Sequence, residues 1–122
     1  MSDTHAAPLI LVLDDEPLIL IDLELALEDE GAEPVEVRTV DEALRRIGER
    51  VPDAAVLDVN LGRGATCAPV AARLRELGVP FVLHTGDLDR QGETVASLGG
   101  QIVPKPTPGH VVAQRVLDLV RG

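Results

Sequence analysis

Short runs of consecutive apolar residues alternate along the chain with longer stretches in which apolar residues recur every three or four positions. Runs such as 9–13 and 54–57 are typical of strands buried on both faces of a sheet. The stretches between them have the spacing of amphipathic helices. Five such repeats predict an α/β domain whose parallel sheet is covered on both faces by right-handed crossover helices.

The pattern also sets approximate bounds for each element. The expected strands cover 9–13, 34–37, 54–58, 80–84 and 101–104. The expected helices run from the start signal Asp15-Glu16-Pro17 to about Glu30, from a cap at Thr39 or Asp41 through Glu49, from about 70 to 77, from 88 to 98, and from about 108 to 120. The helix over 88–98 is the least secure because Gly92 lies in its interior. Residues 1–7 are expected to be frayed, which leaves one domain over 8–122.

The start of the first helix has a specific expected chemistry. Asp15 is expected to act as an acidic N-cap, and Pro17 to occupy the first helical turn. On this helix Ile19, Leu23, Ala26 and Leu27 form the expected core stripe. A second apolar stripe, Leu18, Ile21 and Leu25, lies on the opposite side and is either partly covered by neighbouring helices or used as a docking surface.

Charge and composition argue against several classes of function and site. The net charge of −10 disfavours nucleic acid as a partner, because sequence-independent binding depends on basic residues that neutralise phosphates. Aromatic residues make up 1% of the chain, so stacking platforms for bases are also missing. The single cysteine, Cys67, excludes an internal disulfide and a thiolate metal cluster. No apolar run is long enough to span a membrane and no signal peptide is evident, so a cytoplasmic protein is expected.

Polar side chains that can carry chemistry stand where the expected strands end. Asp14 and Asp15 follow the first apolar run, and Asp58 ends the third strand. Thr85 follows the fourth strand, and Lys105 follows the fifth. Because ligands bind at the carboxyl ends of strands in open α/β sheets, we expect these five side chains to converge.

Three carboxylates at one place repel each other, and a hard divalent cation relieves that repulsion. Mg²⁺ accepts a few protein oxygens and keeps positions for water and phosphoryl oxygens. We expect Asp15 and Asp58 as direct ligands, Asp14 through water, and the backbone carbonyl of Asn60 as a further ligand. Asp58 can then attack phosphorus in line, while Lys105 supplies a second positive charge.

The order and spacing of Asp14-Asp15, Asp58, Thr85 and Lys105-Pro106 resemble the receiver domain of two-component response regulators over essentially the whole chain. The resemblance implies a flavodoxin-like (βα)5 fold with strand order 2-1-3-4-5. It implies that Asp58 accepts a phosphoryl group from a histidine kinase, that Thr85 and Lys105 sense this group, and that the Lys105–Pro106 bond is cis.

One position departs from the receiver pattern. Receivers carry an aromatic residue three positions before the lysine, and this chain has Ile102 there. Thr85-Gly86 resembles part of the Phe-Ala-Thr-Gly motif of a subfamily that serves HWE and HisKA2 kinases, with Leu83 and His84 in place of Phe and Ala. His84 itself is expected to be a hydrogen-bonded or pocket-lining residue of a buried strand.

The resulting expectation is a stand-alone receiver, a monomer or weak homodimer, that signals through protein contacts in a phosphorelay or beside a kinase. It is not expected to be an enzyme beyond its own phosphorylation and dephosphorylation. Two alternatives stay open. One is a small Mg²⁺-dependent phosphatase or phosphotransferase that uses Asp58 as nucleophile. The other is a binding module that keeps the acidic cluster for structural reasons alone.

Overall fold

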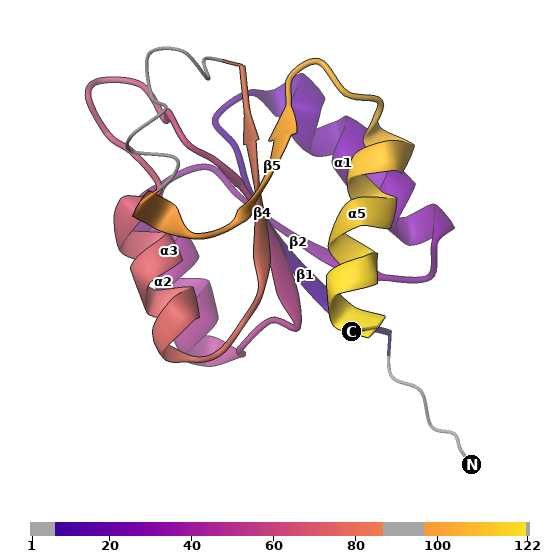
Figure 1. Ribbon diagram of the computed structural model, residues 1–122, viewed down its shortest axis with the longest axis horizontal. Coiled ribbons are helices and arrows are strands. Elements are labelled where there is room, and N and C mark those ends of the chain that lie inside the picture. The colour runs from indigo at the N-terminus through magenta and orange to yellow at the C-terminus, as the bar shows by residue number, and fades with distance from the viewer. Residues whose placement is uncertain (1–6, 87–96, 122) are drawn as a thin grey trace.

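The computed structural model describes residues 7–86 and 97–121, which form a parallel sheet with helices on both faces (Figure 1). The elements, in chain order, are β1 (Leu9–Leu13), α1 (Pro17–Asp29), β2 (Glu33–Val37), α2 (Val40–Glu49), β3 (Ala54–Asp58), α3 (Ala68–Glu76), β4 (Phe81–Thr85), β5 (Gln101–Pro104) and α5 (Gly109–Arg121). The helix expected over 88–98 lies mostly outside the described residues, as does most of the start expected to be frayed.

The sheet has the strand order β2-β1-β3-β4-β5, and every neighbouring pair is parallel. The predicted flavodoxin-like order 2-1-3-4-5 is therefore confirmed. The order switches at β1 and β3, because β1 connects through α1 to one edge while β3 leads toward the other. At this switch point the loops after the two strands lead to helices on opposite faces of the sheet, and in open α/β sheets ligands bind at the carboxyl ends of such strands.

Two hydrophobic cores lie on the two faces of the sheet. Alternate residues of β1 point to opposite faces, so Leu11 packs with α2 and α3, whereas Ile10 packs with α1 and α5. Figure 1 shows this division, with α1 and α5 on one side of the strands and α2 and α3 on the other. Strands β1, β3 and β4 are buried along their whole length, as their unbroken apolar runs predict.

Helix ends agree with the sequence in one case and differ in another. Thr39 caps α2, since its hydroxyl accepts a hydrogen bond from the Glu42 amide at 3.1 Å. The acidic N-cap expected at Asp15 is wrong. Glu16 occupies the cap position of α1 without a side-chain capping hydrogen bond, and Pro17 begins the helix.

Two strands also differ by one residue from their expected bounds. Strand β2 begins at Glu33 instead of Pro34, and β4 covers 81–85 instead of 80–84. Thr85 is therefore the last residue of its strand and does not follow it. None of the helices in the described part of the chain combines the length and apolar character needed to cross a bilayer.

Candidate functional site

Asp14 is the first residue after β1, and backbone geometry holds it at the end of the sheet. Its amide donates to the Val37 carbonyl at 3.1 Å, which continues the pairing of β1 with β2. Its Oδ1 accepts a hydrogen bond from the Glu16 amide at 2.9 Å. Asp14 is buried, so its carboxylate is fixed between the strand and the start of α1.

Asp58 ends β3 beside Asp14 on the same face of the sheet, and only 5% of its surface is exposed. The loop that follows is tied to itself, because the Asn60 side chain accepts from the Gly62 amide at 3.1 Å. Gly62 has φ +82°, and a Cβ there would lie 3.5 Å from Asp15 Oδ2. The loop after β3 therefore packs against the acidic residues that follow β1.

Lys105 connects these carboxylates. Its Nζ lies 3.0 Å from Asp14 Oδ2, 3.5 Å from Asp58 Oδ1 and 3.4 Å from Glu16 Oε1. The peptide bond from Lys105 to Pro106 is cis. The Lys105 amide donates to the Thr85 carbonyl at 2.9 Å, which fixes the lysine beside the end of β4. One mostly buried ammonium therefore serves three carboxylates from two different strand ends.

Thr85 stands at the same end of the sheet, on β4. It is buried and in register with Pro104 of β5, the residue before Lys105. At the following residue, Gly86, a Cβ would lie 3.5 Å from Lys105 Cβ, an ordinary contact distance. The end of β4 therefore packs against the stem of the lysine.

The carboxylates carry more negative charge than Lys105 offsets. Burial raises the pKa of Asp58 to about 7, with the Asp14 charge adding to the rise and Lys105 opposing it. Burial also raises the pKa of Asp14, although hydrogen bonds from the Glu16 amide and Lys105 oppose that rise. Burial alone would lower the pKa of Lys105, but its hydrogen bond to Asp14 and the nearby Asp58 charge raise it instead. The cluster therefore favours an additional cation.

The donor set fits a hard cation. Carboxylate oxygens of Asp14, Asp15 and Glu16 lie within 4.8 Å of one another, and all are oxygen ligands of the kind that Mg²⁺ selects. Asp58 adds a further carboxylate beside Asp14, through their shared contact with Lys105. The structure thus brings the expected carboxylates and the lysine to one place.

Sequence reasoning missed the part played by Glu16. It was interpreted only as a residue of the helix start, whereas its carboxylate faces Lys105 and lies in the acidic group. The available signal was the unbroken acidic run Asp14-Asp15-Glu16 immediately after a buried strand. Because Glu16 stands at the cap position, its side chain is free to turn back toward the strand ends.

His84 is the second unexpected feature. It is buried on β4 in register with Asp58, and neither ring nitrogen has a hydrogen-bond partner among the described residues. Burial and then the Lys105 charge lower the pKa of His84 to about 4. Of the two expected roles, hydrogen-bonded or pocket-lining, the described residues therefore do not provide the first, and the ring is neutral near pH 7.

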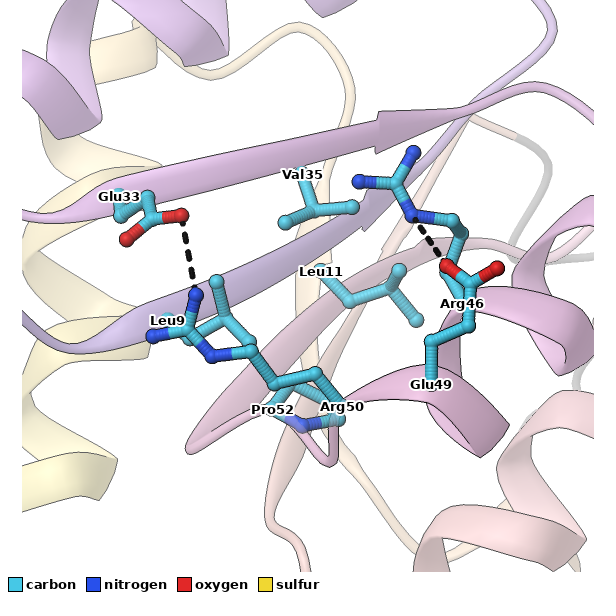
Figure 2. Close-up of a pocket in the computed structure, with 8 residues that line it drawn as sticks. All are labelled: Leu9, Leu11, Glu33, Val35, Arg46, Glu49, Arg50 and Pro52. Carbon is cyan, nitrogen blue, oxygen red and sulfur yellow. Dashed lines mark hydrogen bonds and ion pairs between the residues drawn. The ribbon is translucent and has the colours of Figure 1, made fainter.

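A separate hollow of about 180 Å³ lies at the opposite end of the sheet, near the amino ends of β1 and β2 (Figure 2). Leu9, Leu11 and Val35 supply its apolar lining. The arginines around it are paired within the chain: Arg50 lies 3.2 Å from Glu33, and Arg46 lies 3.5 Å from Glu49. None of the sequence-predicted site residues lines this hollow.

Comparison with known proteins gives relatives over most of the chain. No family model matches the chain. Over 117 residues, or 93% of this chain, it is 30% identical to the transcriptional regulatory protein AfsQ1 of Streptomyces coelicolor. The aligned part is 52% of that protein, so the chain spans about half the length of this curated relative.

Two solved structures have similar folds that match nearly the whole length of both chains. SdrG of Sphingomonas melonis is 36% identical with a TM-score of 0.77, and the match covers 98% of this chain and 100% of that one. A response regulator receiver protein of Sinorhizobium medicae is 24% identical with a TM-score of 0.82, and the match covers 95% of this chain and 96% of that one. At 24% identity, the likeness to the Sinorhizobium medicae protein shows the fold alone.

Proposed function

Because the chain belongs to the response regulator receiver family of two-component signalling, we propose that it accepts a phosphoryl group on Asp58 from a histidine kinase. In this proposal the phosphorylated form signals through protein contacts. The phosphorelay role expected from the sequence is part of the proposal.

One observation carries the proposal: a single ammonium joins two buried carboxylates at the ends of neighbouring strands. Lys105 Nζ is 3.0 Å from Asp14 and 3.5 Å from Asp58. The ammonium lies farther from Asp58 Oδ1 than from Asp14 Oδ2, so Asp14 holds it more closely. An incoming phosphoryl oxygen can therefore attract Lys105 without breaking a tight bond to the nucleophile.

The transfer is a displacement at phosphorus. An Asp58 carboxylate oxygen forms a new O–P bond while the P–N bond of the phosphohistidine breaks. The bonding electrons return to the histidine nitrogen, and a proton on the other ring nitrogen lets the ring leave as neutral imidazole. Lys105 stabilises the negative charge on the transferred oxygens, and we assign the Thr85 hydroxyl to hydrogen bonding with the same group.

Asp15, Asp58, the backbone carbonyl of Asn60 and, through water, Asp14 are the proposed holders of Mg²⁺, with Glu16 beside them. When bound, the ion neutralises charge on the phosphoryl oxygens. The raised pKa of Asp58 supports this assignment, because a neighbouring cation favours the ionised nucleophile.

We also propose the class of histidine kinase that phosphorylates this chain. Thr85-Gly86 and the absence of an aromatic side chain at Ile102 support membership of the subfamily that serves HWE and HisKA2 kinases. Ile102 is 44% exposed on edge strand β5. An inward ring rotation at this position is therefore not the switch we propose for this chain.

Intact-mass measurement tests the assignment to Asp58. The full chain is incubated with acetyl phosphate and Mg²⁺, and compared with Asp58→Asn and with a matched surface variant, Asp41→Asn. We expect wild type and Asp41→Asn to gain the mass of one phosphoryl group, and Asp58→Asn to gain none. Equal labelling of Asp58→Asn would overturn the assignment.

Two other results would favour the alternatives. Sustained turnover of an added phosphate ester, abolished in Asp58→Asn, would indicate a phosphatase or phosphotransferase. No labelling of wild type by acetyl phosphate or by any phosphorylated kinase would leave the acidic cluster with a structural role, and the proposed function would be wrong.

A further inference from the structure

A second hollow opens between the start of α2 and the loop that follows β3. Its volume of about 230 Å³ is that of several water molecules, at roughly 30 Å³ each. Val40 and Leu61 form its apolar part and pack against the core beneath. Asp14, Asp58 and Lys105 are not among the described residues that line it, so this hollow is separate from the acidic cluster.

Two arginines line this hollow, one from each of the segments that form it. Arg38 directly follows β2, and Arg63 lies in the loop after β3. No ion pair within residues 7–86 and 97–121 involves either arginine. The Arg38 side chain donates one hydrogen bond, to the Asp15 carbonyl at 3.3 Å. Because a guanidinium has five N–H donors, most of those at the hollow are available to a ligand.

The hollow is a locally positive place on an acidic chain. Its lining contains these two arginines and, among the described residues, one acidic side chain, the exposed Asp41. Glu42 does not line it, and its carboxylate accepts a hydrogen bond from the Arg38 amide at 2.9 Å. The whole chain, by contrast, has a net charge of −10. An anion is therefore the kind of ligand that this hollow favours.

The backbone at Arg63 supports a role for its side chain. Its φ is +52°, in the left-handed region that residues with a Cβ seldom adopt, and the flanking Gly62 and Gly64 have φ +82° and +78°. A third glycine would adopt this conformation without the same cost. The loop therefore holds a long cationic side chain at the hollow in spite of an unfavourable backbone conformation.

Both segments are held in place by hydrogen bonds. The Leu61 amide donates to the Ala65 carbonyl at 3.0 Å, and the Ala65 amide donates to the Gly62 carbonyl at 2.9 Å. On the other side, the Thr39 hydroxyl caps α2 through the Glu42 amide. The hollow is therefore preformed, and a ligand would not have to order its walls.

We propose that this hollow binds a phosphate group, either as the free ion or as a monoester. A guanidinium can make two parallel N–H···O bonds to phosphate, and two guanidiniums balance the charge of a dianion. A carboxylate has a single charge and would use this pair of arginines less fully. The inference goes beyond the proposed function, because binding in the hollow requires no transfer to Asp58.

The test is a titration of the full chain followed by its backbone amide NMR signals, in metal-free buffer at constant ionic strength. Without a metal ion the carboxylates of the acidic cluster repel anions, so that cluster does not compete for the probe. Inorganic phosphate and glycerol phosphate are the two probes. We expect saturable shifts of the Val40, Gly62 and Ala65 amides, and none at Thr85 or Lys105.

Paired variants measure the contribution of the arginines. Arg38→Gln/Arg63→Gln should weaken binding of each probe about tenfold or more, because the charge-assisted bonds to phosphate are lost. Arg73→Gln/Arg121→Gln is the matched control, since it changes the net charge equally and each of these arginines is paired within its own helix. The control should bind like wild type. If the double variant of the hollow does not fold, Arg38→Gln and Arg63→Gln alone should each weaken binding about threefold.

The outcomes also identify the source of the phosphate group. Binding of both probes would indicate a phosphate monoester, whereas binding of inorganic phosphate alone would indicate the free ion. Equal affinities in the hollow variant and the control would overturn the inference, as would the absence of saturable shifts in wild type or shifts confined to Thr85 and Lys105. Acetyl phosphate labelling of Asp58 tests the proposed function separately, so either conclusion can fail while the other stands.

Discussion

At the residue scale, the site places charged and neutral polar groups in a low-dielectric environment. His84 and Asp58 lie in register on neighbouring strands, and burial disfavours the charged form of each. The pKa of the histidine is therefore lowered while that of the carboxyl is raised. These opposite shifts give opposite dependences of stability on pH.

The unpartnered ring of His84 gives the first prediction. Its pKa is about 4 in the fold and about 6.5 when unfolded, so the unfolded chain binds the proton first as pH falls. Stability from the neutral ring is fully present above pH 6.5 and is lost toward pH 4. The wild-type free energy of unfolding, relative to His84→Leu, should fall by about 2 kcal/mol from pH 7.5 to pH 5. Denaturant titration of both proteins measures this, and a constant difference would contradict it.

The raised pKa of Asp58 predicts the reverse trend. Between its ordinary value of 3.8 and about 7, the folded chain keeps a proton that the unfolded chain has lost, so stability decreases as pH rises through this window. In metal-free buffer at pH 7.5, Asp58→Asn should therefore raise the free energy of unfolding by about 1–3 kcal/mol. Asp41→Asn is the surface control.

Addition of Mg²⁺ should reduce the difference in free energy of unfolding between Asp58→Asn and wild type. Wild type gains stability from an ion that binds the folded chain alone, whereas Asp58→Asn has lost one ligand. Thermal melts with and without Mg²⁺ measure the gain. An equal rise in melting temperature for both proteins would argue against Asp58 as a ligand.

At the scale of elements, two glycines respond differently to the same substitution. A Cβ at Gly100, just before β5, would lie 2.6 Å from a ring carbon of Phe81 and 3.0 Å from its carbonyl oxygen. Gly48 lies inside α2, and a Cβ there has open space around it. The first glycine permits a close approach of backbone to core, whereas the second only weakens its helix.

Gly100→Ala should therefore destabilise the fold by about 1–3 kcal/mol, because the core must move to accept the methyl group. Gly48→Ala should stabilise it by up to about 1 kcal/mol through helix propensity. Urea unfolding of the two variants measures both effects. Opposite signs are the expected result, and a neutral or stabilising effect of Gly100→Ala would show that the contact with Phe81 does not limit packing.

At the scale of the whole molecule, α1 faces two ways. Its inner residues join the core with α5, while a second apolar stripe of Leu18, Ile21 and Leu25, here called the outer stripe, remains at least half exposed or nearly so. The stripe contributes little to the core, so its replacement affects stability weakly. A substitution there therefore separates docking from folding.

Ile21→Glu places a charge in the centre of the outer stripe. If the stripe is the docking surface for the proposed kinase, docking would bury this unpaired charge, which is costly. We expect kinase phosphotransfer to fall at least tenfold, on the order of 1.4 kcal/mol or more, while acetyl phosphate labelling is retained. Ile21→Val keeps the apolar character and should transfer nearly normally. Equal loss of both reactions in Ile21→Glu would indicate a folding defect instead.

Much of this architecture followed from local pattern. The buried strands were predicted because a sheet covered on both faces needs continuous apolar runs, and their bounds shifted by one residue at most. The convergence of the acidic residues on Lys105 followed from the rule that parallel strands end at one edge. The functions of the site residues stay predictions.

Local pattern could not predict three features: the contact of Glu16 with Lys105, the hydrogen-bonding state of His84, and the cap residue of α1. A side chain at a helix start can serve the helix or turn toward a neighbouring site, and only the position of Lys105 made Glu16 part of the cluster. The hydrogen-bonding state of His84 depends on atoms from other strands and helices. The local sequence contains neither the distance from Glu16 to Lys105 nor the distances from the His84 ring to its neighbours.

The sequence by itself determined the strands, the strand order through family resemblance, and the edge of the sheet where polar side chains gather, because hydrophobic periodicity and chain connectivity fix these features. Tertiary structure alone decided that Lys105 lies closer to Asp14 than to Asp58, that Glu16 joins them, and that the outer stripe is uncovered. Such contacts depend on the packing of residues that are far apart in the chain, and on which electrostatic partner lies nearer once water is excluded.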